Sequence, residues 1–239
     1  MALSDLAVRI ATRRSVVSLV ERFARRSTPS QGRTDRAAVA LTFDDGPHPI
    51  WTPKILDALD QASAKATFFV VGKCAARHPE LVVETRRRGH EIGTHLYSHD
   101  RATAFDDRLF DQEIRRSKTE LESLLGEAIR WLRFPYGERG PWDPRRVKSA
   151  YGLDMVHWTY SSHDGRLADP DDVLARVRAG LRAGVILLMH DALVDEDRIR
   201  APYFAARDVT VAALPRIGAL LRERGLSAVT LSELVDSRP

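Results

Sequence analysis

The sequence has almost no cysteine and no long apolar run, and both absences narrow the kind of protein it encodes. Cys74 is the single cysteine among 239 residues, so an internal disulfide framework is excluded and nothing requires an oxidising compartment. No stretch approaches the roughly 18 apolar residues that a membrane-spanning helix needs. Internal repeats and low-complexity tracts are also missing. A hydrophobic content of 44% with 29% charged residues is typical of a soluble globular protein, and the length suits a single α/β domain.

The excess of positive charge is confined to the first 36 residues. This segment carries eight arginines and three acidic residues, which gives +5 and leaves −1 for the rest of a chain whose net charge is +4. The rest of the chain has no basic stripe with interleaved aromatic residues, the pattern that indicates nucleic-acid binding. We therefore expect no nucleic-acid partner.

Residues 1–36 are interpreted as a basic N-terminal helix or arm with a linker, followed by one domain at residues 37–239. Apolar residues recur in the arm at near-helical spacing with arginines between them, which predicts an amphipathic helix packed on the domain or a partly disordered arm. Peripheral contact of this helix with a membrane, or binding to a partner, is the alternative. Arg13-Arg14 resembles a twin-arginine signal, but Glu21 and Arg22 interrupt the apolar stretch too early for a signal peptide. We expect a cytoplasmic protein.

Apolar runs of strand length alternate with helix-like segments along the domain, and this alternation predicts a parallel sheet covered by helices. The predicted strands span residues 39–43, 66–71, 90–94, 131–134, 155–158, 185–189 and 228–231. The predicted helices span residues 53–62, 79–89, 106–125, 143–150, 170–181 and 208–224. About seven parallel strands suit an α/β fold of the distorted (β/α) barrel type better than a flat, doubly wound sheet.

Unusual polar residues fall where these strands end. The residues at or just after a predicted strand end are Asp44, Asp45, His95, Arg133, Asp164 and His190. In a βα barrel, active sites are built on the face that carries the carboxyl ends of the strands. The two adjacent aspartates at the end of a buried strand are costly unless a cation offsets their charge. His95 and His99 are four residues apart, so both imidazoles can face one point if the chain turns helical between them.

One carboxylate and two histidines make a three-ligand metal site with positions open for water, which is typical of a catalytic rather than a structural metal. Two other kinds of metal site use similar residues. A thermolysin-like site needs glutamate directly after the first histidine, where this chain has Leu96. The facial triad of an iron oxygenase has the same ligand types but does not account for a second aspartate, an arginine and a distant histidine.

Five short motifs occur along the chain: TFDDG at 42–46, HLYSH at 95–99, RFPYG at 133–137, SSHD at 161–164 and LMH at 188–190. In sequence and order they resemble the motifs of the polysaccharide deacetylase family, also called the NodB-homology family or family 4 carbohydrate esterases. The resemblance covers roughly residues 38–231. It implies a metal-dependent hydrolase that removes an N-acetyl group from an amino sugar and releases acetate. The substrate we expect is an oligosaccharide or a small glycoconjugate.

The resemblance also implies a role for each reacting group. Asp45, His95 and His99 would bind one divalent metal ion, Zn²⁺ in the first place, with Co²⁺, Ni²⁺ or Mn²⁺ as alternatives. Asp44 would be the general base that takes a proton from water. His190 would be the general acid that protonates the departing amine, a step that amide hydrolysis requires.

Four further residues would support these groups. Arg133 would pair with the general base and keep it ionised, and Asp164 would pair with the general acid and favour its imidazolium form. The backbone N–H of Tyr136 would stabilise the oxyanion together with the metal. Leu188 would line the pocket for the methyl group of the acyl chain.

Three positions depart from the family pattern, and all three concern the surroundings of the substrate. Leu96 replaces the usual Ser or Thr, Ser161 replaces the usual first Asp of the fourth motif, and Gly165 replaces a Trp. Two alternatives therefore stay open. One is hydrolysis of another acyl group, a formamide or an O-acetyl ester. The other is a non-catalytic carbohydrate-binding protein, against which the presence of Asp44 and His190 argues.

Overall fold

The computed structural model describes residues 31–101, 106–138, 142–193 and 207–236. The helix or arm predicted at the N-terminus lies outside these residues, apart from the end of the linker. That end lies against the domain, where the N–H of Gly32 donates to the carbonyl of Gly184 (2.8 Å). In the described part of the chain, no helix has the length and apolar character needed to cross a membrane.

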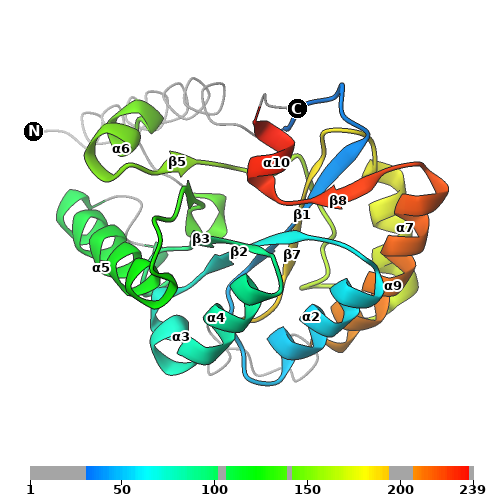
Figure 1. Ribbon diagram of the computed structural model, residues 1–239, viewed down its shortest axis with the longest axis horizontal. Coiled ribbons are helices and arrows are strands. Elements are labelled where there is room, and N and C mark those ends of the chain that lie inside the picture. The colour runs from blue at the N-terminus through cyan, green and yellow to red at the C-terminus, as the bar shows by residue number, and fades with distance from the viewer. Residues whose placement is uncertain (1–30, 102–105, 139–141, 194–206, 237–239) are drawn as a thin grey trace, which may run out of the picture.

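One sheet of parallel strands forms the centre of the fold (Figure 1). Its strands are β1 (Ala38–Asp44), β2 (Ala66–Val70), β3 (Glu91–Thr94), β4 (Trp131–Leu132), β5 (Asp154–Met155), β6 (Tyr160–Ser161), β7 (Ile186–His190) and β8 (Ser227–Val229). They follow the order β5-β4-β3-β2-β1-β7-β6, while β8 pairs with the first residues of β1. The predicted distorted barrel of about seven parallel strands is confirmed.

The sheet curls because β5 and β6, the strands at its two opposite ends, are only a few residues apart in the sequence. β5 pairs with β4, and β6, a few residues later, pairs with β7. Between them, the N–H of Val156 donates to the carbonyl of Leu132, and the N–H of Thr159 donates to the carbonyl of Ile186 (2.9 Å each). One segment therefore bridges the first and last parts of the sheet, as barrel closure requires. The strand predicted at 155–158 is therefore wrong beyond Met155, where β5 ends, and β6 was not predicted.

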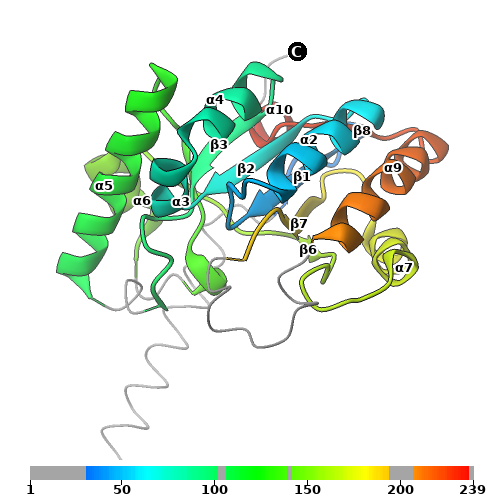
Figure 2. The ribbon, with the colours of Figure 1, turned by 90° about the horizontal axis from the view of Figure 1, so that it is seen from below.

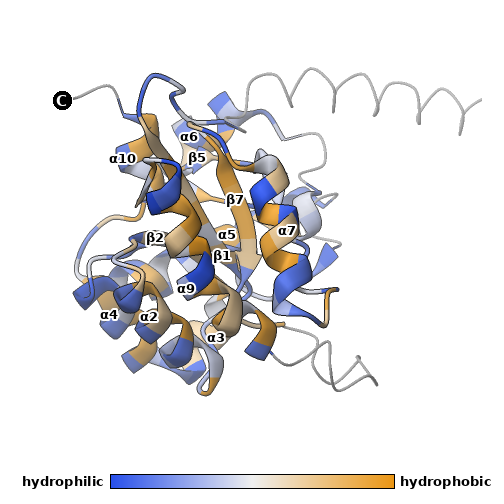
Figure 3. Ribbon diagram, turned by 90° about the vertical axis from the view of Figure 1, so that its right-hand side faces the viewer, coloured by the Kyte–Doolittle hydropathy of each residue, from blue (hydrophilic) through white to orange (hydrophobic). Residues whose placement is uncertain are grey.

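Helices cover the outside of the sheet, and neighbouring helices contact one another in the order α5, α4, α2, α9 and α7 (Figures 1 and 2). The helices are α2 (Trp51–Gln61), α3 (Gly72–Arg77), α4 (Pro79–Arg87), α5 (Asp107–Leu125), α6 (Pro144–Tyr151), α7 (Pro170–Gly180), α9 (Asp208–Glu223) and α10 (Leu231–Val235), with a 3-10 turn η2 (Pro135–Gly137). The side chains of Asp106, Asp143 and Asp169 cap α5, α6 and α7 by accepting backbone N–H groups. Figure 3 shows β1 and β7 mostly in the hydrophobic colour, with hydrophilic residues on the surrounding helices.

The C-terminal segment packs at the end of the barrel where the strands begin. β8 pairs with the start of β1, and Leu231 and Leu234 of α10 are fully buried in an apolar cluster with Phe69 and Trp131. The strand predicted at 228–231 is wrong at its end, because β8 ends at Val229 and α10 begins at Leu231. Thr230 instead caps α10 in a reciprocal capping box with Glu233, a local signature that overrides the apolar run.

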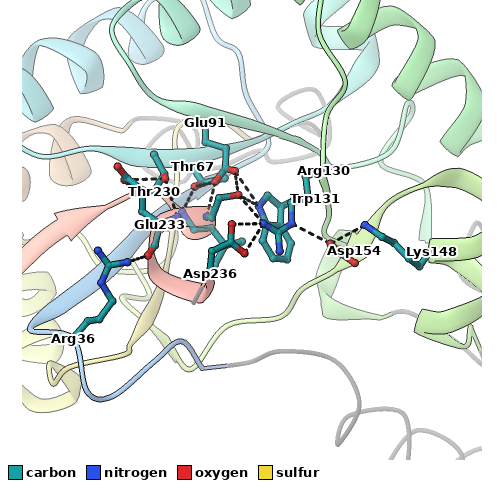
Figure 4. A network of polar contacts seen from close by, with 12 residues as sticks. Arg36, Thr67, Glu91, Arg130, Trp131, Lys148, Asp154, Thr230, Glu233 and Asp236 are labelled. Carbon is teal, nitrogen blue, oxygen red and sulfur yellow. Dashed lines mark hydrogen bonds and ion pairs between the residues drawn. The ribbon is translucent and has the colours of Figure 1, made fainter. Parts of the chain in front are cut away.

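A network of polar contacts fastens this segment to the strands (Figure 4). Glu91, the first residue of β3, accepts hydrogen bonds from the indole N–H of Trp131 (3.0 Å), the hydroxyl of Thr67 (2.8 Å) and the N–H of Ser232 (3.1 Å). One carboxylate thus joins β2, β3, β4 and α10. The opposite end of the barrel, where the strands finish, carries the polar residues Asp44 and His190.

Candidate metal centre

The carboxyl ends of β1, β3 and β7 bring the predicted metal ligands and acid–base residues together. Asp44, the last residue of β1, lies opposite His190, the last residue of β7, in the parallel register. Asp45 follows with a left-handed backbone (φ 83°), and His95 directly follows β3. Asp44, Asp45 and His95 are all buried. The site therefore lies on the face of the barrel that the sequence predicted.

Asp45, His95 and His99 form a compact set of potential metal ligands. One carboxylate oxygen of Asp45 lies 3.1 Å from Nε2 of His99 and 3.6 Å from Nε2 of His95. One ligand atom from each residue lies within 4.8 Å of the others, and all three residues are buried. The four-residue spacing predicted that a helical turn would bring the two imidazoles together, but the chain between the histidines is not helical. Leu96 and His99 have left-handed backbones instead (φ 63° and 62°), and the resulting loop brings both imidazoles to Asp45.

Hydrogen bonding and burial prepare Asp45 and His95 for a divalent cation. Nδ1 of His95 lies 2.8 Å from the carbonyl of Arg133, and because a carbonyl only accepts, this nitrogen donates and leaves the Nε2 lone pair facing the site. Burial lowers the pKa of His95 to about 4, so the ring is neutral at pH 7. Burial acts to raise the pKa of Asp45, but the hydrogen bond with His99 and the nearby histidines outweigh it and lower this pKa. One carboxylate and two imidazoles are donors that fit Zn²⁺ and similar ions.

Arg133 holds the second aspartate beside this set. Its side chain is fully buried, and Nη1 donates to a carboxylate oxygen of Asp44 (2.8 Å) and to the hydroxyl of Thr42 (2.7 Å). The other oxygen of Asp44 lies 3.7 Å from Nε2 of His95. Burial lowers the pKa of Arg133, while the charge of Asp44 opposes this change. The pair thus places a carboxylate oxygen next to the ligand atoms.

His190 and Asp164 form the second predicted pair. Nδ1 of His190 donates to Asp164 (3.0 Å), whose carboxylate also accepts the hydroxyls of Ser162 and Thr210 (2.8 Å each) and the backbone N–H of His190 (2.9 Å). Burial acts to raise the pKa of Asp164, but the charge and hydrogen bond of His190 lower it to about 2. Burial likewise acts to lower the pKa of His190, but Asp164 raises it to about 9. The imidazolium form of His190 is therefore favoured at neutral pH.

Tyr136 and Leu188 are the two predicted substrate contacts, and each lies near a residue of the site. The ring of Tyr136 packs on the ring of His99 with 4.6 Å between centroids, and the guanidinium of Arg101 lies 4.1 Å from the centre of the same ring. Tyr136 itself has a left-handed backbone (φ 59°) in the turn after β4. Leu188 precedes His190 by two residues on β7, so both side chains point to the same side of the sheet.

Two buried carboxylates at the site were not singled out from the sequence. Asp191, directly after the last motif, accepts the N–H of Gly46 (3.0 Å) and the hydroxyl of Thr52 (2.6 Å), and burial raises its pKa to about 7. Glu113 of α5 accepts two backbone N–H groups of the loop at residues 96–98. Its signal in the sequence is an acidic residue on the apolar stripe of a predicted helix.

The comparisons with known proteins agree with one another. The polysaccharide deacetylase family matches residues 31–156 of this chain. A chitooligosaccharide deacetylase of Sinorhizobium fredii is 34% identical over 201 residues, which cover 84% of this chain and 92% of that protein. A peptidoglycan-N-acetylglucosamine deacetylase of Bacillus cereus is 34% identical over 199 residues, which cover 82% of this chain and 87% of that protein.

The fold has a solved counterpart as well. The crystal structure of a peptidoglycan N-acetylglucosamine deacetylase in complex with 4-naphthalen-1-yl-N-oxidanyl-benzamide matches with a TM-score of 0.77 at 31% sequence identity. The match covers 92% of this chain and 97% of that one. Most of the chain, and not only the motif regions, is thus shared.

Proposed function

The chain belongs to the polysaccharide deacetylase family, and from this premise we propose that it is a metal-dependent N-deacetylase that removes the acetyl group of an N-acetylated amino sugar. The observation that carries the proposal is the buried set Asp45, His95 and His99, with a carboxylate held by arginine on one side and a histidine held by aspartate on the other. Amide hydrolysis needs an electrophile, a base and an acid, and the site contains a candidate for each.

The metal ligands and the base act on the first half of the reaction. Asp45, His95 and His99 would hold a divalent ion, which would supply Lewis-acid chemistry for the acyl carbonyl and for water. Asp44 takes the proton from the attacking water, because one of its oxygens is engaged by Arg133 and the other faces the ligand atoms. Arg133 holds this carboxylate in place by a hydrogen bond of 2.8 Å and offsets its charge.

His190 acts on the second half. The C–N bond breaks when the nitrogen receives a proton, and imidazolium at His190 is the donor, with Asp164 fixing the ring through Nδ1. The backbone N–H of Tyr136 donates to the oxyanion, and Leu188 contacts the acetyl methyl group. Acetate and the free amino sugar leave as products.

We propose Zn²⁺ as the ion, because a carboxylate and two imidazoles form a ligand set that zinc binds with an open position. Co²⁺, Ni²⁺ and Mn²⁺ are ions that the same donors accept. We propose an oligosaccharide or a small glycoconjugate as substrate. Support comes from the relatives, which are deacetylases of chitooligosaccharides and of peptidoglycan N-acetylglucosamine.

Metal analysis of the purified protein, followed by acetate release, tests the proposal. N-acetylglucosamine, its oligomers and peptidoglycan fragments are offered as substrates, with O-acetylated and N-formylated sugars alongside. We expect about one equivalent of metal and acetate release from an N-acetyl sugar that a chelator abolishes and added Zn²⁺ restores. Activity that a chelator leaves intact contradicts the metal mechanism. Faster release of acetate from the O-acetyl compound, or of formate from the N-formyl compound, replaces the N-acetyl group with that ester or formamide as the proposed substrate group.

Asp44→Asn and Asp45→Asn are a matched pair that separates base from ligand. Both remove one negative charge from adjacent buried positions. We expect Asp44→Asn to keep the metal and lose turnover, whereas Asp45→Asn loses both. Equal loss of metal in the two variants overturns the assignment of the base.

A further inference from the structure

The loop that joins the two histidine ligands has an unfavourable backbone conformation. Leu96 and His99 both have positive φ (63° and 62°), although neither is glycine. A residue with a side chain adopts this region only at a cost in free energy, so the surrounding structure must hold it there. Because His99 is reached through this loop, whatever holds the loop also sets the position of that imidazole relative to His95.

Glu113 of α5 binds the loop from one side. A single carboxylate oxygen, Oε2, accepts the backbone N–H groups of both Tyr97 (3.0 Å) and Ser98 (2.6 Å). Glu113 is only 9% exposed and lies on the buried face of α5, next to Ile114 and one turn after Phe110. A charge at such a position is costly unless it is hydrogen-bonded, and bonds from N–H groups to an ionised carboxylate are of the strong kind.

A second residue of the same helix face supports the start of the loop. The N–H of Leu96 donates to the hydroxyl of Thr94 (3.0 Å), and this hydroxyl is hydrogen-bonded to that of Ser117 (2.6 Å). Ser117 is fully buried and follows Glu113 by four residues, so both side chains point to the same side of α5. Helix α5 therefore supports three consecutive N–H groups between the ligands, two of them directly.

A second helix, α3, binds carbonyl groups of the loop. The N–H groups of Gly72 and Lys73 donate to the carbonyls of Leu96 and Tyr97 (2.9 Å each). These are N–H groups of the first turn, which have no partner inside the helix. A Cβ at Gly72 would lie 2.5 Å from the ring of Tyr97, so the close approach of α3 to the loop requires glycine there.

We infer that Glu113 is a positioning residue that fixes the loop between His95 and His99 and thereby sets the affinity for the metal. The inference rests on the proposed metal site. Glu113 acts through the backbone of Tyr97 and Ser98. Residues that orient metal ligands in this indirect way typically change affinity by about 10–100-fold when they are lost.

Glu113→Leu and Glu113→Gln test the inference in the full-length protein. Leucine removes the oxygen that accepts both hydrogen bonds and suits the apolar face of α5. Glutamine keeps an acceptor oxygen without its charge. The Kd for Zn²⁺ is measured by competition with a chromophoric chelator. We expect it to rise about 10–100-fold in Glu113→Leu and by a few-fold in Glu113→Gln, because neutral hydrogen bonds are weaker than charge-assisted ones.

Glu122→Gln is the matched control. Glu122 lies on the same helix, accepts the backbone N–H of Ile129 (3.1 Å) and pairs with Lys118 (2.6 Å), all away from the ligand loop. We expect this variant to bind Zn²⁺ as the wild type does. Amide hydrogen exchange gives a second readout without metal: the N–H groups of Tyr97 and Ser98 should exchange faster in Glu113→Leu than in the wild type.

An unchanged Kd in a folded Glu113→Leu protein overturns the inference. If Glu113→Leu does not fold, Glu113→Gln is the test. A Kd for Zn²⁺ equal to that of the wild type in Glu113→Gln then overturns the inference. A similar rise in Glu122→Gln also contradicts it, since the effect is then one of general stability. Zn²⁺ binding and acetate release by the wild-type protein test the proposed function separately, so the two failures are distinguishable.

Discussion

Replacing Asp164 with asparagine removes the negative charge that keeps the general acid protonated. Burial opposes protonation of His190, but Asp164, with smaller contributions from the charges of Asp45 and Asp44, raises its pKa from 6.5 to about 9. A general acid works in its protonated form, so activity falls as the pH rises through this pKa. With a pKa near 9, about 90% of His190 is protonated at pH 8, whereas with a pKa of 6.5 or below the fraction is about 3% or less. We therefore expect Asp164→Asn to lose about 30-fold or more in kcat at pH 8 and little at pH 5.5.

The assay is a pH profile of kcat for acetate release at saturating substrate and Zn²⁺, between pH 5 and 10. The basic limb should move down by about two pH units or more in Asp164→Asn. Thr210→Val is the matched control. It removes one hydroxyl that donates to Asp164 (2.8 Å) but keeps the carboxylate, so its basic limb should stay close to that of the wild type. A uniform loss at all pH values in Asp164→Asn would falsify the reasoning, because it indicates misplacement of His190 rather than a change in its protonation.

Three further predictions concern other parts of the molecule. Arg133→Met leaves the buried carboxylate of Asp44 without its cation, so the free energy of unfolding should fall by about 3–5 kcal/mol and turnover should be lost. Denaturant titration measures the first effect, and wild-type stability contradicts the prediction. Leu234→Ala opens a cavity in the fully buried cluster at the far end of the barrel, which should lower the free energy of unfolding by about 2–5 kcal/mol while kcat at 25 °C is kept. Burial raises the pKa of Cys74 to about 11, so iodoacetamide at pH 7.5 should leave both Cys74 and activity intact; rapid labelling refutes it.

The positions of the predicted site residues followed from the sequence because a parallel sheet brings strand ends to one edge. Asp44, His95 and His190 end or directly follow three predicted strands, and the structure places those strands close together. The short elements were less predictable. β4, β5 and β6 have two residues each, too few for an alternating pattern, and their pairing depends on the curl of the whole sheet. The six-residue helix α3 was not predicted for the same reason.

The two supporting carboxylates show a different limit of the sequence. Glu113 binds N–H groups 15 and 16 residues before it, and Asp191 binds the N–H of Gly46, 145 residues away. An acidic residue on an apolar helix face indicates that a partner exists, but the spacing does not say which backbone group it is. Only the packing of α5 against the ligand loop determines that partner.

The backbone conformations explain why motifs alone do not make this site. Among the described residues, six that are not glycine have positive φ, and all except Ser63 belong to the motifs: Asp45, Leu96, His99, Tyr136 and His163. Each costs about 1–3 kcal/mol, and local propensity argues against all of them. The hydrogen bonds that hold the neighbouring backbone come partly from residues outside the motifs, such as Glu113. Free energy from the rest of the fold therefore maintains the ligand geometry, and substitutions at these supports should weaken metal binding before they unfold the protein.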